Sequence, residues 1–195
     1  MNIFTKKVFD KKAQKRKSPL LFQKGLSLIE ASMVLALSAI VVSGVMYYYQ
    51  AASDNNKTQS TVSEVMSIVS AVNGLYVGTS GYNGLTEKVI MNTSAIPENY
   101  KSGTDIIHPF GGKIDIGATA DNTKYYIILN DVPQGACVNL ASMNFGTSLA
   151  GAEVGPNVLQ TAKTGKLKSV NALTPENASN LCNSKTANKI AFLLK

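Results

Sequence analysis

One short string places a small residue, an apolar run and a carboxylate in an unusual order. Gly25 ends a polar and basic segment, the apolar run begins directly at Leu26, and Glu30 is the fifth residue of that run. A charged side chain at the centre of a membrane helix costs about 2.5–3.5 kcal/mol on insertion scales. Glu30 lies near one end of the run, where the cost is lower, but a carboxylate there still requires a role. The simplest alternative is that it reaches interfacial water and has no partner.

The two cysteines are the next residues that could do chemistry. Cys137 and Cys182 are not part of a C-x-x-C motif, and the single His108 cannot complete a metal site with them. If this part of the chain lies outside the cytoplasm, a disulfide between them is the natural pairing. Zinc ligation and two free core thiols are the alternatives. His108 is expected to be an ordinary loop residue, and we expect neither a metal nor a cofactor.

A long apolar segment must position the carboxylate. Residues 26–49 contain Glu30 as their only charged residue and are long enough to span a bilayer, which takes about 20 residues. The segment is also longer than the apolar region of a secretory signal, about 7–15 residues. Its basic flank predicts that residues 1–25 stay in the cytoplasm while the rest of the chain crosses the membrane. The three tyrosines at 47–49 then lie near the outer interface, which favours aromatic rings.

The positive charge of the chain is concentrated in its N-terminal segment. The whole chain carries a formal net charge of +7. Residues 1–25 hold eight basic and one acidic side chain, which also sum to +7, whereas residues 26–195 hold 11 of each sign. The body of the protein therefore has no net positive field, and this argues against nucleic-acid binding.

The apolar segment is expected to continue as one helix from about residue 26 to 77. No proline occurs between Pro19 and Pro97, and apolar residues recur at helical spacing after residue 61. We expect these apolar residues to form one face, which packs on a globular body, and the polar residues between them to form the opposite face. The apolar set is Val62, Val65, Met66, Val69, Val72 and Tyr76, and the polar set is Ser63, Glu64, Ser67 and Ser70.

The rest of the chain predicts an α+β head built on an antiparallel β-sheet. Strand-like runs occur at 113–117, 125–130 and 190–194, and the last is apolar enough to be central in the sheet. Thr174 and Pro175 are typical of the N-cap and first position of a helix, which would carry the second cysteine. Short helices are candidates near 84–92 and 134–145, and residues 146–172 are expected to be loop-rich.

The string from Gly25 to Glu30 resembles the type III signal of type IV pilins and type II secretion pseudopilins. The 25-residue leader and the aliphatic Leu26 resemble the type IVb subgroup of these pilins. Within that subgroup the chain resembles the bundlins, the subunits of bundle-forming pili. The matching segments are GLSLIE (25–30), MVLAL (33–37), ASDNNK (52–57), SEVMS (63–67), NTSAIPENYK (92–101) and FGG (110–112).

The resemblance implies how the N-terminal string is used. A prepilin peptidase is expected to cleave between Gly25 and Leu26, after which Leu26 is N-methylated. Glu30 is expected to pair with the N-terminal amine of a neighbouring subunit during assembly. The disulfide between Cys137 and Cys182 would enclose 44 residues, for which the chain-entropy model gives about 4 kcal/mol.

The resemblance also implies a domain organisation and a function. Residues 1–25 would be a cleaved cytoplasmic leader, 26–50 a transmembrane and assembly helix, and 51–195 an extracytoplasmic head with the type IV pilin fold. The protein would be a structural prepilin, held in the inner membrane before the pilus assembly machinery polymerises it into an extracellular pilus. Its partners would be further copies of itself, the peptidase and that machinery, and the pilus would serve adherence, aggregation or conjugative contact.

Two other functions are compatible with the sequence. A minor pilin or a type II secretion pseudopilin would have the same N-terminal signal without building the shaft of a filament. A membrane-anchored enzyme would need a catalytic cluster on the head, and we find no nucleophile–base pair, phosphate-binding loop or paired carboxylate motif. We therefore predict that the chain is not an enzyme.

Overall fold

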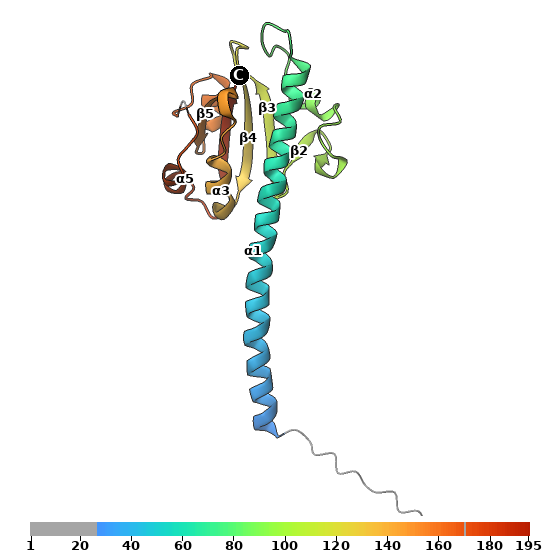
Figure 1. Cartoon of the computed structure of the whole chain (residues 1–195), viewed down its shortest axis with the longest axis vertical. Coiled ribbons are helices and arrows are strands. Elements are labelled where there is room, and N and C mark those ends of the chain that lie inside the picture. The colour runs from blue at the N-terminus through green and yellow to red at the C-terminus, as the bar shows by residue number, and fades with distance from the viewer. Residues whose placement is uncertain (1–26, 170) are drawn as a thin grey trace, which may run out of the picture. The chain divides into compact units, whose positions relative to one another are not determined.

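The structure is a computed structural model that describes residues 27–169 and 171–195. These residues form two compact units, which divide between Gly44 and Val45. Helix α1 (Leu28–Leu75) contributes its first residues to one unit and its last residues to the other (Figure 1). Gly25 and Leu26, where the sequence predicts cleavage, lie outside the described residues.

Helix α1 confirms the expected long N-terminal helix, but its buried face differs from the predicted one. The buried residues of the helix are Thr61, Glu64, Val65, Ile68, Val69 and Val72. Met66, expected on the apolar face, is 45% exposed, whereas Glu64, expected on the polar face, is only 4% exposed. The prediction is confirmed for Val65, Val69 and Val72, and it was wrong for Met66 and Glu64 because the helix is covered from two sides. The sheet covers one side, and residues from the segment after helix α2 (Glu87–Met91) cover the side of Glu64.

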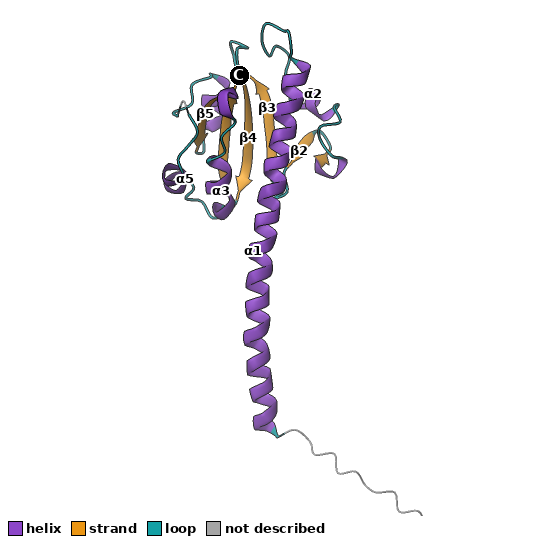
Figure 2. Cartoon of the chain, in the orientation of Figure 1, coloured by secondary structure: helices purple, strands orange, loops and turns teal. Residues whose placement is uncertain are grey.

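Within the described residues, six strands form a single antiparallel sheet in the order β1-β2-β3-β4-β6-β5. Figure 2 draws the strands in orange. The strands are β1 (Lys101–Ser102), β2 (Asp105–Ile107), β3 (Lys113–Ala118), β4 (Tyr125–Val132), β5 (Leu149–Val154) and β6 (Asn188–Leu194). The expectation that the final strand is central is confirmed, because β6 pairs with β4 on one side and β5 on the other.

The central strands are apolar at consecutive positions because both faces of the sheet are covered. Tyr125 and Ile127 of β4 belong to the main core with α1, whereas Tyr126 and Ile128 belong to a second core under α4 (Val158–Lys163). Side chains alternate between the two faces of a strand, so a strand buried on both faces loses the usual apolar–polar alternation.

The remaining helices are short and surround the sheet. They are α2 (Glu87–Met91), α3 (Gln134–Ala141) and α5 (Pro175–Leu181), with 3-10 turns at Glu98–Tyr100 and Gly146–Ser148. The N-cap prediction is confirmed, because the Thr174 hydroxyl accepts a hydrogen bond of 3.3 Å from the Asn177 backbone N–H. The cysteine predicted on this helix, Cys182, is instead the residue that caps its C-terminus.

The described part of residues 146–172 contains more regular structure than the sequence predicts. They contain strand β5 and helix α4, whereas we expected a loop-rich segment. The sequence of β5, LAGAEV, has little of the β-branched and aromatic character that identifies strands. Its pairing with β6 rather than its own propensity determines its conformation.

His108 has a larger structural role than the loop residue that the sequence suggests. It is 1% exposed, its Nε2 lies 2.7 Å from the Asn130 carbonyl oxygen, and its Nδ1 accepts a bond of 3.3 Å from the Phe110 N–H. A Cβ on Gly112 would overlap both the Asn130 carbonyl oxygen and the His108 ring. The FGG segment therefore allows the turn before β3 to close tightly against β4.

Candidate assembly site

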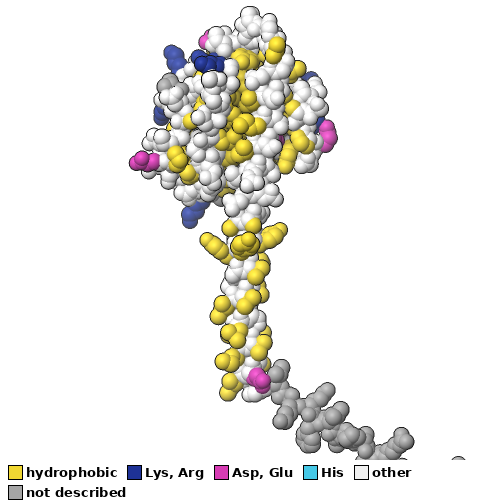
Figure 3. All heavy atoms as spheres, viewed as in Figure 1, with side chains coloured by type: hydrophobic (Ala, Val, Ile, Leu, Met, Phe, Trp, Pro, Cys, Tyr) yellow, Lys and Arg dark blue, Asp and Glu magenta, His cyan; other side chains and the backbone are white. Residues whose placement is uncertain are grey.

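The first part of α1 exposes an unusual amount of apolar surface. An 18-residue window in this helix has a mean hydropathy of 2.1, and none of that window is buried in the structure. Leu28, Leu35 and Ile40 are each at least 68% exposed. Hydrophobic side chains are distributed along this stretch on the face shown in Figure 3. Water-soluble monomers rarely expose continuous apolar surface of this extent, so lipid or other helices must cover it.

Serine hydroxyls within this apolar stretch donate hydrogen bonds to the preceding turn of the helix. The Ser32 hydroxyl donates to the Ile29 carbonyl oxygen at 2.8 Å, and the Ser43 hydroxyl donates to that of Ile40 at 2.9 Å. Such bonds to the preceding turn allow a serine to sit in lipid without an unpaired donor. These two serines are therefore compatible with a hydrocarbon environment.

Glu30 lies in the first turn of α1 and is exposed. The α-helical hydrogen-bond pattern begins close by, since the Ala31 N–H donates to the Ser27 carbonyl oxygen at 2.9 Å. A carboxylate is favoured at this end of a helix because the first N–H groups carry partial positive charge. No described residue forms an ion pair with Glu30. Its carboxylate is therefore free, among the described residues, to accept a positive group from outside the subunit.

The second part of α1 is fixed to the head. Val65, Ile68 and Val72 have no exposed surface and belong to the main core, together with residues of β3, β4 and β6. Fully burying an aliphatic side chain contributes about 1.5–3 kcal/mol. The head therefore holds the C-terminal part of the helix, while the N-terminal part stays unburied within the subunit.

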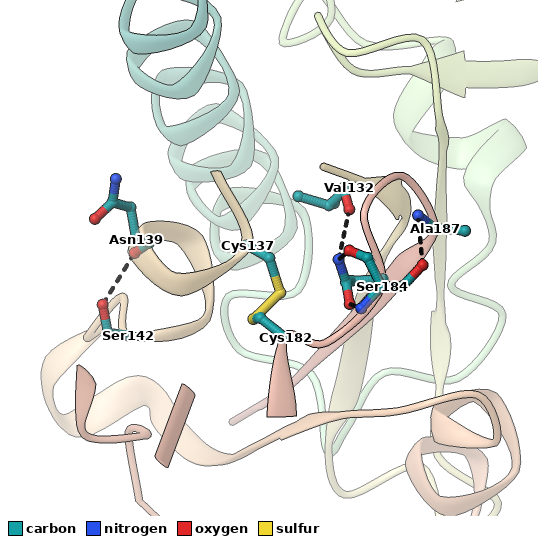
Figure 4. The surroundings of a disulfide bond; sticks show 8 residues. Val132, Cys137, Asn139, Ser142, Cys182, Ser184 and Ala187 are labelled. Carbon is teal, nitrogen blue, oxygen red and sulfur yellow. Dashed lines mark hydrogen bonds between the residues drawn. A yellow bond between two sulfur atoms is a disulfide. The ribbon is translucent and has the colours of Figure 1, made fainter. Parts of the chain in front are cut away.

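Cys137 and Cys182 form a disulfide, with Cα atoms 5.9 Å apart. The bond joins helix α3 to the end of α5, and both residues are buried (Figure 4). The loop that leads on to β6 is fixed by Asn188, whose Nδ2 donates to the carbonyl oxygens of Val132 and Ser184 at 3.0 and 2.6 Å. The disulfide therefore connects the end of α5 to α3, and the Asn188 side chain connects the start of β6 to the end of β4.

Sequence reasoning missed one unusual group, the carboxyl of Glu64. Neither of its oxygens has a hydrogen-bond partner among the described residues, and burial raises the pKa of Glu64 to about 8. An unsatisfied buried polar group typically costs about 1–3 kcal/mol. The signal was present in the sequence, because Thr61, Glu64, Ile68 and Val72 recur at the three- and four-residue spacing of one helix face.

The family of the chain follows from its match to known proteins. Residues 50–195 match the Bundlin family. The chain belongs to the bundlin family. Two relatives, both described as the major structural subunit of bundle-forming pilus, come from Escherichia coli O127:H6 and Escherichia coli O111:H-. Each is 45% identical over 190 residues, with 89% of this chain and 95% of the relative covered.

The fold of this bundlin also has a solved counterpart. TcpA, a type IV pilin from the El Tor biotype of Vibrio cholerae, aligns with a TM-score of 0.50 at 14% identity. The alignment covers 72% of this chain and 99% of TcpA. The type IV pilin fold predicted from the sequence is thereby confirmed. The bundlin is a structural subunit of a pilus and not an enzyme.

Proposed function

We propose that this bundlin is the major subunit of a bundle-forming pilus and is made as a prepilin. A prepilin peptidase cleaves it between Gly25 and Leu26, Leu26 is N-methylated, and the assembly machinery polymerises the product. The observation that carries this proposal is the exposed apolar part of α1, with one carboxylate in its first turn. The name of the two Escherichia coli relatives supports the same function.

Before assembly, residues 26–50 anchor the subunit in the inner membrane. The leader, residues 1–25, stays in the cytoplasm because its charge of +7 resists transfer across the membrane. The head, residues 51–195, lies on the other side, where a disulfide is stable. Assembly then exchanges lipid around the apolar helix for the helices of neighbouring subunits, and the filament carries the heads into the extracellular medium.

Small residues on the apolar helix favour this exchange. Ser32, Ala36, Ala39 and Ser43 recur every three or four residues and therefore lie along one side of the helix. Small side chains at this spacing let two helix backbones approach closely. The exposed branched and aliphatic side chains around them supply the packing area.

Glu30 selects and positions the incoming subunit. Cleavage creates a positive amine at Leu26, and this amine exists only in the mature protein. Inside a filament, water is removed from around Glu30, so an unpaired carboxylate would be costly. Pairing it with the amine of a neighbour offsets that cost and sets the axial register of one helix against the next.

The N-terminus of surface filaments tests the processing step directly. Filaments sheared from cells that express the full chain are expected to yield subunits that begin at N-methylated Leu26. Gly25→Val should leave the uncleaved chain in the membrane, because a peptidase must fit the chain closely beside the bond that it cuts. Gln23→Ala, which lies two residues earlier and keeps all charges, is the matched control. A filament subunit that starts at any other residue contradicts the proposal.

The abundance of the subunit tests the assignment as the major component. We expect this chain to make up most of the protein mass of purified filaments. A trace amount in filaments built from another subunit would instead identify a minor pilin.

A further inference from the structure

The hydrogen bonds of the His108 ring fit only its neutral form. Its Nε2 lies 2.7 Å from the Asn130 carbonyl oxygen, so this nitrogen carries the ring proton and donates it to the carbonyl. Its Nδ1 then has a free lone pair, which accepts a hydrogen bond of 3.3 Å from the Phe110 backbone N–H. A second ring proton would have to lie on Nδ1, where it would point at the Phe110 N–H. A charged His108 is therefore incompatible with this turn.

The turn at residues 108–112 also covers the ring. The Gly111 N–H donates to the His108 carbonyl oxygen at 2.7 Å, and the His108 N–H donates to the Gly112 carbonyl oxygen at 3.0 Å. His108 is 1% exposed, and a Cβ on Gly112 would come within 2.6 Å of its Nε2. A buried cation is costly unless it has a partner or reaches water. The charged ring can reach water only if the turn moves away from β4.

Phe110 connects this turn to helix α1. Its ring packs against the main core and makes an edge contact with the His108 ring, with centroids 6.1 Å apart. The Lys57 ammonium of α1 lies 5.9 Å from the centroid of the Phe110 ring. Lys57 comes four residues before Thr61, the first buried residue of α1. The turn therefore supports the helix close to the point where it leaves the head.

We propose that residues 108–112 form an acid-sensitive clamp on α1, which is closed while His108 is neutral and opens when its Nδ1 binds a proton from the medium. Opening breaks the hydrogen bond from the Phe110 N–H, brings the charged ring to water and withdraws Phe110 from Lys57. The part of α1 around Lys57 then loses its support from the head. The clamp belongs to the single subunit and does not depend on the proposed polymerisation.

The groups that face His108 act on its charge in opposite directions. Burial has the largest effect and lowers the pKa of His108 below its ordinary value of 6.5, whereas the Asn130 carbonyl and the Asp131 carboxylate of β4 act to raise it. From α1, the positive charge of Lys57 lies against the Phe110 ring and disfavours a second positive charge nearby. These effects and the hydrogen bonds favour the neutral ring in the closed clamp.

A separate ion-pair network lies on the elements around the clamp. Lys113 of β3 is 3.0–3.4 Å from three carboxylates, those of Glu87, Asp105 and Asp115. Burial is the largest effect on Glu87 and raises its pKa, so this carboxyl can also titrate below pH 7. Substitution of the histidine separates the two responses, because it leaves the network in place.

The direction of the pH dependence follows from the two states of the clamp. In the open clamp the ring has the ordinary histidine pKa of about 6.5, and in the closed clamp its pKa is lower. The neutral ring therefore stabilises the closed clamp fully above pH 6.5, and this contribution is lost as the pH falls below that value. His108 is the single histidine of the chain, so no other imidazole contributes.

Hydrogen exchange followed by NMR tests the clamp in the full chain in detergent. After correction for the intrinsic effect of pH, we expect the Phe110 amide to be less protected at pH 5 than at pH 7. The limit is about 30-fold, because at pH 5 an imidazole with a pKa of 6.5 is protonated by about that ratio. Amides of residues 57–61 should lose protection with it, and those of β4 and β6 should not. A change of less than twofold at Phe110 overturns the inference.

Two variants separate the proton from the contact with α1. His108→Gln keeps an amide donor for the Asn130 carbonyl and cannot titrate, so its clamp should show no pH dependence. Phe110→Leu keeps the backbone N–H and removes the ring beside Lys57. Its clamp should still respond to pH, whereas residues 57–61 should not. Phe145→Leu changes another ring that packs against the main core and is the matched control, with both responses as in the wild type.

Each remaining outcome contradicts one step. A pH response that persists in His108→Gln assigns it to another group, such as Glu87, and removes the role of the histidine. A response of residues 57–61 that persists in Phe110→Leu removes the link to α1. If His108→Gln does not fold, the wild-type imidazole signal replaces it in the test. An imidazole that titrates at or above pH 6.5, or without a change at the Phe110 amide, is inconsistent with the clamp.

Discussion

Replacing Glu64 by glutamine should change how the stability of the subunit depends on pH. Glutamine keeps the shape of the side chain and removes its titration. Burial raises the pKa of Glu64 from 4.5 to about 8. Between these two pH values the folded subunit keeps a proton on Glu64 that the unfolded chain has lost. The contribution of Glu64 to stability is therefore complete below pH 4.5 and is lost as the pH rises through about 8. The glutamine variant should not show this loss.

The magnitude follows from the shift in pKa. At 1.36 kcal/mol per pKa unit, the shift from 4.5 to about 8 sets an upper limit of about 5 kcal/mol. The effective dielectric constant of a folded protein is higher than that of a dry interior, which lowers such a cost below this limit, and we therefore expect about 2–3 kcal/mol between pH 4 and pH 9. With a urea dependence of about 2 kcal/mol per molar, the midpoint of wild-type unfolding should fall by about 1 M relative to the variant.

The assay is urea unfolding of the purified subunit in detergent at several pH values. Comparing wild type with Glu64→Gln removes the contribution of all other titrating groups, because these are common to both proteins. Ser63→Ala, which changes the exposed residue before Glu64 without changing a charge, should keep the wild-type dependence on pH. Parallel profiles for wild type and Glu64→Gln would show that the carboxyl is solvated in the folded subunit, and the reasoning from burial would then be wrong.

Three further changes test other parts of the structure. The Glu30→Ala subunit should be inserted and cleaved but give few filaments, because recognition of the neighbouring amine is lost. Pili are counted by electron microscopy, and Ser38→Ala is the control. Cys182→Ser should destabilise the head by about 4 kcal/mol, since the disulfide spans a sequence separation of 45, without changing membrane insertion. Gly112→Ala should cost about 1–3 kcal/mol through overlap with the Asn130 carbonyl group, measured as a lower urea midpoint.

Each of these predictions has an outcome that contradicts it. Normal numbers of pili from Glu30→Ala would remove the assembly role of this carboxylate. An unchanged urea midpoint for Cys182→Ser would mean that the disulfide adds nothing to the folded head. Gly135→Ala is the control for Gly112→Ala, because a Cβ at Gly135 meets no atom within 4 Å. Equal midpoints for these two variants would contradict the packing argument.

The long helix and the central strands could be predicted because each has a strong local pattern. Helix α1 has an uninterrupted apolar segment and no proline, and it was predicted to within two residues at each end. Strands β4 and β6 are dense in isoleucine, leucine and aromatic residues, which fit a pleated and buried surface. The N-cap threonine of α5 acts within a single turn, so its neighbours in sequence were sufficient to identify it.

The parts that could not be predicted depend on contacts between distant segments. Half of the residues in strand β5 are alanine or glycine, and the segment is a strand because β6 lies beside it. The burial of Glu64 depends on Pro97 and Tyr100, which lie more than 30 residues further along the chain. His108 is buried because the chain turns tightly against Asn130. No local pattern records such contacts, since they arise only when the sheet and helix come together.

The position of β6 has a consequence for how the head is made. In chain order β6 follows every other strand, yet it occupies the place between β4 and β5. Until it arrives, both of those strands expose an edge of unpaired N–H and carbonyl groups and part of the apolar core. A growing chain that has been synthesised only as far as β5 therefore cannot complete its sheet. In that interval the open slot can accept a strand from another molecule, so aggregation competes with folding until the last seven residues of the sheet are in place.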